Sequence, residues 1–177
     1  MFIRDEARLA VSFPAAAARL ADLARRGRLM TASQDAFQAG LARLEAHPAP
    51  APAVSVSGLA RARFRELIVR GDAADLALRW EAHGPGGELF PALDADVTLS
   101  PDGAAATLLA LAGVYRVPAG EPGRGLDGAI VRHMAEETTR TFVSLMAAAI
   151  TAARSGSGSG HGGITDGGSW PPAFRAP

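Results

Sequence analysis

The stretch Gly113–Arg154 reads GVYRVPAGEPGRGLDGAIVRHMAEETTRTFVSLMAAAITAAR and decides the fold that we predict for this chain. It begins as a strand, passes through a loop rich in proline and glycine, and continues as a long helix. Apolar side chains recur on that helix at steps of three and four, so they form one stripe, and charged side chains lie opposite. The stripe is Ile130, Val131, Met134, Thr138, Phe142, Leu145, Met146 and Ala149, opposite Arg132, Glu136 and Arg140. Such a helix needs an apolar surface to pack on.

The residues before the long helix supply that surface as a series of strands. Alternation of apolar and polar residues predicts half-buried strands over 61–70, 76–82 and 93–99. A shorter strand is expected near Val54, and a strand over 107–117 leads into the long helix. The tetrapeptide SPDG at 100–103 has proline and glycine at the positions that a tight turn prefers. It predicts a hairpin between the last two strands.

The N-terminal part of the chain predicts one strand and two helices. Residues 2–13 alternate, with Ile3, Ala7 and Leu9 on the apolar face. Pro14 suits the first turn of a helix over 15–26, and Gly27 suits its end. A second helix is expected from about Ser33, capped by Ser33 or Thr31.

Composition limits the kind of protein. A length of 177 residues fits one domain, which we place at 1–153, while residues 154–177 are rich in glycine, serine and proline and predict a flexible tail. The formal net charge is zero, which gives no general attraction to nucleic acid. The sequence contains neither lysine nor cysteine, which excludes lysine Schiff bases, thiolate nucleophiles and disulfides. No signal peptide and no apolar run of ~18 residues is recognised, so we expect a soluble cytoplasmic protein without membrane insertion.

The order of the elements favours an α+β fold with an antiparallel sheet. The loop that enters the long helix carries Gly113, Tyr115, Pro118, Gly120, Gly123, Leu126 and Asp127. With this loop and helix, the chain resembles the START-like or helix-grip superfamily, which includes the polyketide cyclase/aromatase and Bet v 1-like proteins. The resemblance covers residues 1–153. It implies a curved antiparallel sheet that grips the C-terminal helix, two short helices after the first strand, and a cavity for an apolar ligand between sheet and helix.

Glu66 is the carboxylate with the most interesting predicted position. In a regular strand it shares a face with Phe64 and Ile68, which points it toward the long helix, where an acid in an apolar cavity can bind a ligand hydroxyl or transfer a proton. The alternative is that a shifted register or a bulge turns it outward. Because Arg61, Arg63 and Arg65 lie nearby, an exposed and ion-paired Glu66 is the favoured interpretation.

The other predicted lining residues each have a structural alternative. Trp80 and Tyr115 combine an aromatic ring with a polar group that can orient a ligand, but such residues more often fill a core. Met134 and Met146 suit an adaptable apolar wall, and at helical spacing they are core residues first. Thr138 either bonds back to the preceding helical turn, which is commoner, or faces a wet cavity. The full predicted lining is Phe64, Glu66, Trp80, Tyr115, Met134, Thr138, Phe142 and Met146.

Other constellations do not indicate a catalytic, metal or cofactor site. Strand alternation places Asp94 and Asp96 on the solvated side, which argues against a catalytic pair. The four histidines show no metal-ligand spacing, and the glycine-rich loops lack both a lysine and the strand context of a phosphate or dinucleotide site. We therefore expect no metal and no cofactor.

Three functions remain open. The first is binding of a small hydrophobic or amphipathic ligand, lipid-like or polyketide-like, without evident catalysis. The second is an enzyme like the polyketide cyclases, in which Glu66, Tyr115 or an inward arginine would do the acid/base work. The third is a structural or regulatory protein without a ligand, which contacts a partner through Trp170, Pro171, Pro172 and Phe174 of the tail. A protein partner or a homodimer has no sequence support.

Overall fold

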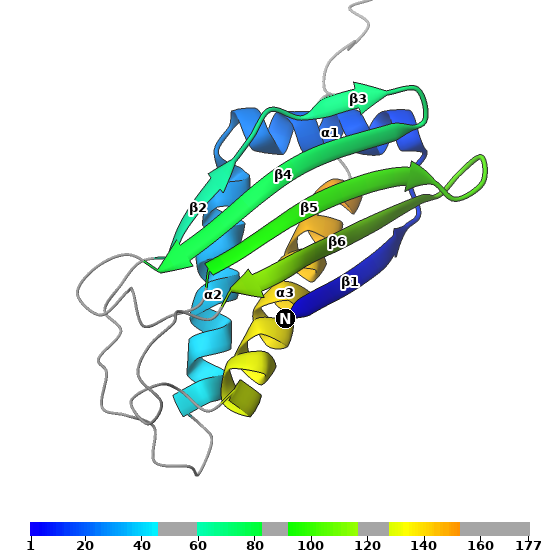
Figure 1. The fold of residues 1–177 in the computed structure, drawn as a ribbon. Helices are drawn as coiled ribbons and strands as arrows, with labels where there is room; N and C mark the ends of the chain where they lie inside the picture. Colours follow the sequence, from blue (N-terminus) through cyan, green and yellow to red (C-terminus); the bar gives the residue numbers. More distant parts are fainter. Residues whose placement is uncertain (46–59, 83–91, 117–127, 153–177) are drawn as a thin grey trace, which may run out of the picture.

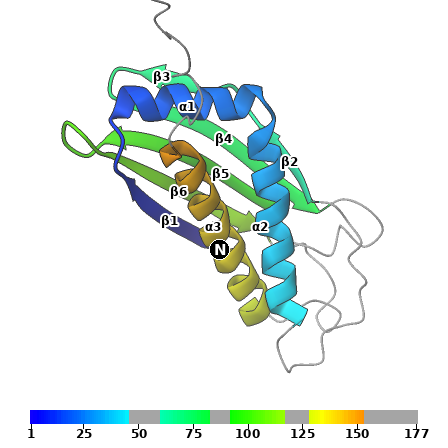
Figure 2. The same ribbon diagram turned by 180° about the vertical axis from the view of Figure 1, so that it is seen from behind.

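The computed structural model describes residues 1–45, 60–82, 92–116 and 128–152, and shows an α+β fold. In these ranges a curved antiparallel sheet has the strand order β1-β6-β5-β4-β2, with β3 paired to β4. All three helices lie on one face of the sheet (Figures 1 and 2). The elements are β1 Phe2–Leu9, α1 Phe13–Arg25, α2 Arg28–Glu45, β2 Ala60–Phe64, β3 Ile68–Arg70, β4 Ala73–Ala82, β5 Ala92–Pro101, β6 Thr107–Arg116 and α3 Gly128–Thr151. This is the helix-grip arrangement expected from the sequence.

The N-terminal elements confirm the order that we predicted and correct two boundaries. β1 ends at Leu9 instead of continuing to residue 13, because the chain turns into α1 at Phe13. Pro14 lies in the first turn of α1 and Gly27 follows its end with a positive φ of 69°, both as predicted. α2 begins at Arg28, not near Ser33, because the backbone N–H of Thr31 already bonds to the carbonyl of Gly27. Ser33 is therefore buried inside the helix, where its hydroxyl donates to Met30 O at 2.9 Å, and is not a cap.

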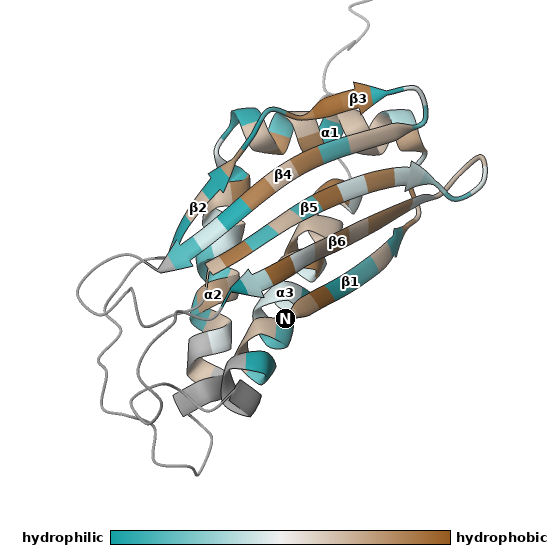
Figure 3. Ribbon diagram, viewed as in Figure 1, coloured by the Kyte–Doolittle hydropathy of each residue, from teal (hydrophilic) through white to brown (hydrophobic). Residues whose placement is uncertain are grey.

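The inner residues of β4, β5 and β6 are buried. The outer positions of β4 and β5 are mostly charged or polar, as predicted, and Figure 3 shows this as alternating bands, whereas the outer positions of β6 are Leu108, Ala110, Ala112, Val114 and Arg116. The hairpin between β5 and β6 is confirmed, but its turn lies later than the predicted 100–103. Ser100 and Pro101 still pair with β6, and the connecting loop covers 102–106, with Gly103 at a φ of 83°.

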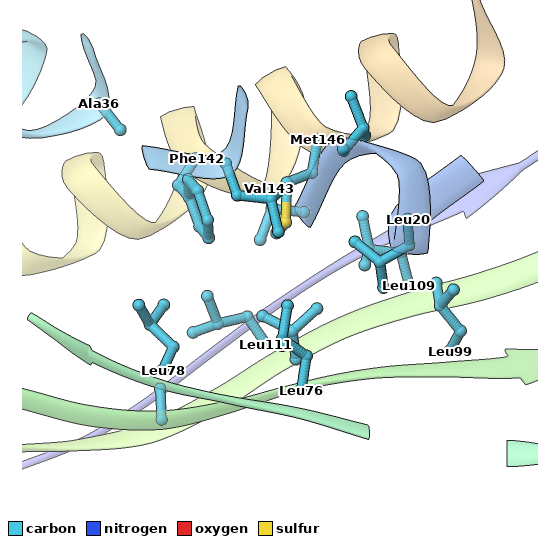
Figure 4. Packing of buried hydrophobic residues seen from close by; sticks show 14 of the residues in the cluster. Leu20, Ala36, Leu76, Leu78, Leu99, Leu109, Leu111, Phe142, Val143 and Met146 are labelled. Atoms are coloured by element: carbon cyan, nitrogen blue, oxygen red, sulfur yellow. The ribbon is translucent and has the colours of Figure 1, made fainter. Parts of the chain in front are cut away.

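The core is a layer of leucines from the sheet packed against α3 and α1. Leu76, Leu99, Leu109 and Leu111 are fully buried. Leu76 and Leu111 lie across from Val143 and Met146 of α3, and Leu99 and Leu109 lie beside Leu20 of α1 (Figure 4). The predicted helix stripe is confirmed for Met134, Thr138, Phe142 and Met146, while Leu145 lies at its edge with 36% of its surface exposed. The opposite side, Arg132, Glu136 and Arg140, is exposed, but Arg140 pairs with Glu137 at 3.1 Å and not with Glu136 as the spacing suggested.

Several predictions fall on residues that the structure does not describe. The strand near Val54 and the tail 154–177 lie outside the described ranges, so the domain limits 1–153 and the tail contact stay predictions. Within the described ranges, no helix has the length and apolar character needed to cross a bilayer.

α2 and α3 pack side by side and approach each other most closely at a glycine. A Cβ added to Gly40 would lie 2.1 Å from Thr138 Oγ1 and 3.3 Å from the carbonyl oxygen of Met134. Real Cβ atoms do not come so close to other atoms, so only glycine fits this position without movement. The pair Gly40 and Thr138 therefore sets the spacing of the two helices.

Gly40→Ala is expected to lower the free energy of unfolding by about 1–2 kcal/mol, although alanine is the better helix former, because overpacking outweighs the gain in propensity. Thr138→Ala removes the clashing hydroxyl, so the double variant should recover most of the loss in a double-mutant cycle followed by chemical denaturation. If Gly40→Ala lowers the free energy of unfolding equally with and without Thr138→Ala, this contact does not limit the approach of the helices.

Candidate functional site: the interior beneath the C-terminal helix

The candidate site lies under α3 at one end of the sheet, which we call the Trp80 end. There β4 ends, β5 begins, β6 ends and α3 begins (Figure 1). Trp80 pairs with Leu93, and Leu93 pairs with Tyr115, so these three side chains form a row across the inner face of three strands. All three are buried. Two of the aromatic residues predicted to line a cavity are therefore neighbours in the same layer.

An aromatic cluster joins this row to α3. The rings of Trp80 and Phe142 meet edge to face, with centroids 4.9 Å apart, and the centroids of Phe64 and Phe142 are 6.3 Å apart. Trp80 is 3% exposed and Phe142 is fully buried. The indole Nε1 of Trp80 is buried without a hydrogen-bond partner among the described residues. A buried tryptophan usually bonds through this N–H, so the site holds an unused donor.

Two threonines of α3 have buried hydroxyls, and that of Thr138 lies at the contact with Gly40 of α2. Thr138 and Thr139 are buried, and neither Oγ1 has a hydrogen-bond partner among the described residues. The back-bond that we expected for Thr138 is therefore absent there. Thr151 on the same helix does form such a bond, to Ala147 O at 2.7 Å. The comparison shows that Thr138 and Thr139 leave polar groups available in an otherwise apolar layer.

Glu66 does not belong to this interior. Phe64 pairs with Leu78 and Ile68 pairs with Asp75, so three residues on one side face two on the other. The N–H of Arg65 still bonds to Ala77 O at 2.9 Å, which places the extra residue at Glu66–Leu67 as a β-bulge. After the bulge Leu67 packs against the core in place of Glu66, and both Glu66 and Ile68 are exposed. The predicted single strand 61–70 is thus wrong, and so is the place of Glu66 in the predicted lining, whereas the favoured exposed position of Glu66 is confirmed.

The small residues around Trp80 are a part of the site that the sequence interpretation missed. Ala62 lies directly across from Trp80, and Ala95 lies directly across from Gly113 on the inner face. All three positions are buried, so the sheet presents backbone rather than large side chains beside the aromatic cluster. Alternation predicts which face of a strand is apolar, but it does not predict that small residues on that face come together beside an aromatic cluster.

Tyr115 is the ionisable side chain of the row. Burial raises the pKa of its phenol far above the ordinary value, since the phenolate would lose its hydration. The group is therefore a neutral phenol over the whole physiological pH range. In that state it can donate a hydrogen bond, and it cannot serve as a general base.

The raised pKa of Tyr115 predicts a specific loss of stability at alkaline pH. The folded pKa exceeds the unfolded value of about 10, so the stabilisation is complete below that pH and decreases as the pH rises above it. The chain has one tyrosine and no lysine or cysteine, so no other side chain has an ordinary pKa near 10. Phenolate absorbance should appear only together with unfolding, and Tyr115→Phe should remove most of the alkaline destabilisation. Phenolate formation near pH 10 in the folded protein would contradict the burial of this group.

The outer face of the sheet carries the charged residues. Asp94 pairs with Arg79 and with Arg116, each at 3.2 Å, and Glu81 pairs with Arg79 at 3.3 Å. Asp94 thus lies on the solvated side, as predicted, and an ordinary ion-pair network accounts for it. A hollow of about 540 Å³ on this face is lined by Arg63, Arg65, Ala77, Leu78, Arg79, Asp94, Ala95 and Asp96.

A second depression lies between the three helices. It has a volume of about 210 Å³ and is lined by Leu23, Arg28, Leu29, Thr31, Ala32, Asp35, Leu145, Met146 and Ala149. No group of three or more metal-ligating side chains comes together in the described part of the chain. Of the four histidines, only His133 falls in the described ranges, on the exposed side of α3.

Comparison with known proteins gives a weak structural likeness only. No family model and no curated protein matches the sequence. A structure of norcoclaurine synthase from Thalictrum flavum, in complex with dopamine and hydroxybenzaldehyde, is 13% identical over 78% of this chain and 84% of that one, with a TM-score of 0.32. A truncated form of the same enzyme is 12% identical over 78% and 91%, with a TM-score of 0.31. Values this low carry no argument about function, and the fold rests on the strand order and helix placement described above.

Proposed function

We propose that the chain binds a small hydrophobic or amphipathic molecule between the sheet and α3, at the Trp80 end. The observation that supports this most is the set of unused hydrogen-bonding groups in the interior: Trp80 Nε1, Thr138 Oγ1 and Thr139 Oγ1. A buried polar group left without a hydrogen-bond partner costs about 1–3 kcal/mol of stability. Three such groups are therefore unusual in a core that binds no ligand. A bound molecule with matching polar atoms removes that cost.

The lining suits such a molecule. Apolar and aromatic walls with a few placed polar groups are typical of small-molecule sites. Here the walls are Trp80, Phe142 and Phe64, with a polar atom on Trp80, and Thr138 offers a hydroxyl at the neighbouring contact between α3 and α2. Met134 and Met146 are buried on the same stripe of α3 and add adaptable apolar surface.

An enzyme like the polyketide cyclases has less support. The buried polar side chains in the described ranges are Ser33, Thr107, Thr138 and Thr139, so no carboxylate, imidazole or guanidinium is buried there. Glu66, the acid/base candidate in the sequence, is exposed beyond a bulge. Tyr115 remains protonated. The described interior therefore offers hydrogen-bond donors and apolar surface, but no general base.

The test is direct detection of a ligand. Native mass spectrometry of the purified chain should show a species heavier than the 18.2 kDa polypeptide, and solvent extraction should release the molecule responsible. Titration with the neutral fluorophore 6-propionyl-2-dimethylaminonaphthalene should show saturable binding with a blue-shifted emission.

Two matched variants locate the binding. Ala62→Met fills the inner face across from Trp80, and Ala77→Met adds the same side chain to the outer face of the neighbouring strand. Binding should be lost in the first and kept in the second, with circular dichroism showing that both are folded. Binding that is unaffected by Ala62→Met, or no binding by the unaltered chain, would contradict the proposal.

A further inference from the structure

We propose that the ligand is a neutral molecule bearing an oxygen acceptor, such as a ketone, ester, lactone or quinone, and that the indole N–H of Trp80 selects it. This inference rests on the proposed ligand-binding function and specifies the chemical class. It excludes fatty-acid anions and amines as the principal ligands.

The first step is the chemistry of the indole. Its N–H is a donor only, and the Nε1 atom is buried without an acceptor among the described residues. The ring is held by its edge-to-face contact with Phe142 and by the strand pairing of β4 with β2 and β5. A fixed, desolvated donor favours a ligand with a hydrogen-bond acceptor, and it forms no hydrogen bond with a hydrocarbon.

The second step is the neutrality of the surroundings. No charged side chain is buried in the described ranges, and the ion pairs of the sheet lie on its outer face. The buried Tyr115 is itself held in its neutral form. A carboxylate or ammonium brought into this interior would have no opposite charge to pair with, and burial of an unpaired charge is very unfavourable. A carbonyl oxygen has no such penalty.

The third step is a second polar contact on α3. Thr138 precedes Phe142 by four residues, so it lies one helical turn closer to the start of α3 on the same stripe. Its hydroxyl is also buried without a partner among the described residues. That hydroxyl lies at the contact with Gly40 of α2, so it can bond to a second oxygen only in a ligand that reaches the seam between α2 and α3, whereas the N–H of Trp80 needs an acceptor.

The experiment compares three naphthalenes of nearly the same shape on the full chain: 2-acetylnaphthalene, its methylene isostere 2-isopropenylnaphthalene, and the anion 2-naphthoate. Affinities are measured by isothermal titration calorimetry. The indole N–H signals are followed by ¹H–¹⁵N correlation spectroscopy, since the chain has two tryptophans and Trp170→Phe assigns the Trp80 signal. The ketone should bind about threefold to tenfold more tightly than the alkene and more tightly than the anion, as one net hydrogen bond predicts.

The variant Trp80→Phe keeps an aromatic ring and removes the donor, so it should bind ketone and alkene equally. If that variant does not fold, the unaltered protein decides: the Trp80 N–H signal should move downfield with the ketone and not with the alkene. Equal affinities for ketone and alkene, an unmoved N–H signal, or tightest binding of 2-naphthoate would overturn this inference and leave the proposed function intact. Binding of none of the three would count against both.

Discussion

Phe142→Ala is expected to lower the free energy of unfolding by about 4 kcal/mol, the largest effect of any single substitution that we foresee. Phe142 is fully buried, and its ring contacts both Trp80 and Phe64. Truncation of a buried phenylalanine costs about 3–5 kcal/mol, because apolar contacts are lost and a cavity remains. The loss should be at the upper part of this range, because two aromatic contacts disappear together. Urea denaturation followed by circular dichroism measures it.

Leu145→Ala is the matched control on the same helix. Leu145 is 36% exposed, so it loses less surface from the core than Phe142 does. Its truncation should cost about 1 kcal/mol or less. Similar losses for the two variants would show that α3 does not present Phe142 as the centre of its contact with the sheet.

Gly113→Ala is expected to be the second most destabilising substitution, at about 2–3 kcal/mol. A Cβ at this position would lie 2.5 Å from Ala95 Cβ and 2.6 Å from the carbonyl oxygen of Asp94. The carbonyl belongs to the backbone of β5 and cannot move aside as a flexible side chain would. The strands would have to separate where the sheet curves under α3. Thermal or chemical unfolding of the purified variant reports the change.

Two further variants separate the close contact from the other properties of glycine. Ala95→Gly removes one of the clashing atoms, so combined with Gly113→Ala it should destabilise less than the sum of the single changes. Gly103→Ala lies in the hairpin loop, where no atom is within 4 Å but the positive φ disfavours alanine, so about 1–2 kcal/mol is expected from conformation alone. Additive losses at Gly113 and Ala95 would be inconsistent with a tight contact between β5 and β6.

Periodicity predicted the elements that pack against the core. The alternation in β4 and β5 and the steps of three and four in α3 follow directly from burial on one face, so local sequence determines them. Boundaries set by neighbouring elements were less predictable. α2 begins directly after Gly27 because that carbonyl accepts the first bonds of the new helix, whereas Ser33 has the chemistry of a cap but lies inside.

The error of a continuous strand over 61–70, with Glu66 among the lining residues, has a different physical origin. A bulge changes which face every following residue occupies, and it arises from pairing with β4 rather than from the residues of β2 themselves. The buried position of Trp80 was predictable, since it lies between the charged residues Arg79 and Glu81 in an alternating strand. Whether Trp80 Nε1 finds an acceptor depends on atoms from other strands and from α3, so it could not be predicted from local sequence.

The interior beneath α3 can be observed directly in a crystal structure of the protein purified without added ligand. We expect electron density for a small molecule between the sheet and α3, with an oxygen atom at hydrogen-bond distance from Trp80 Nε1. A packed interior in which Trp80 Nε1 donates to a carbonyl of the chain itself, with no space beside Phe142, would contradict it.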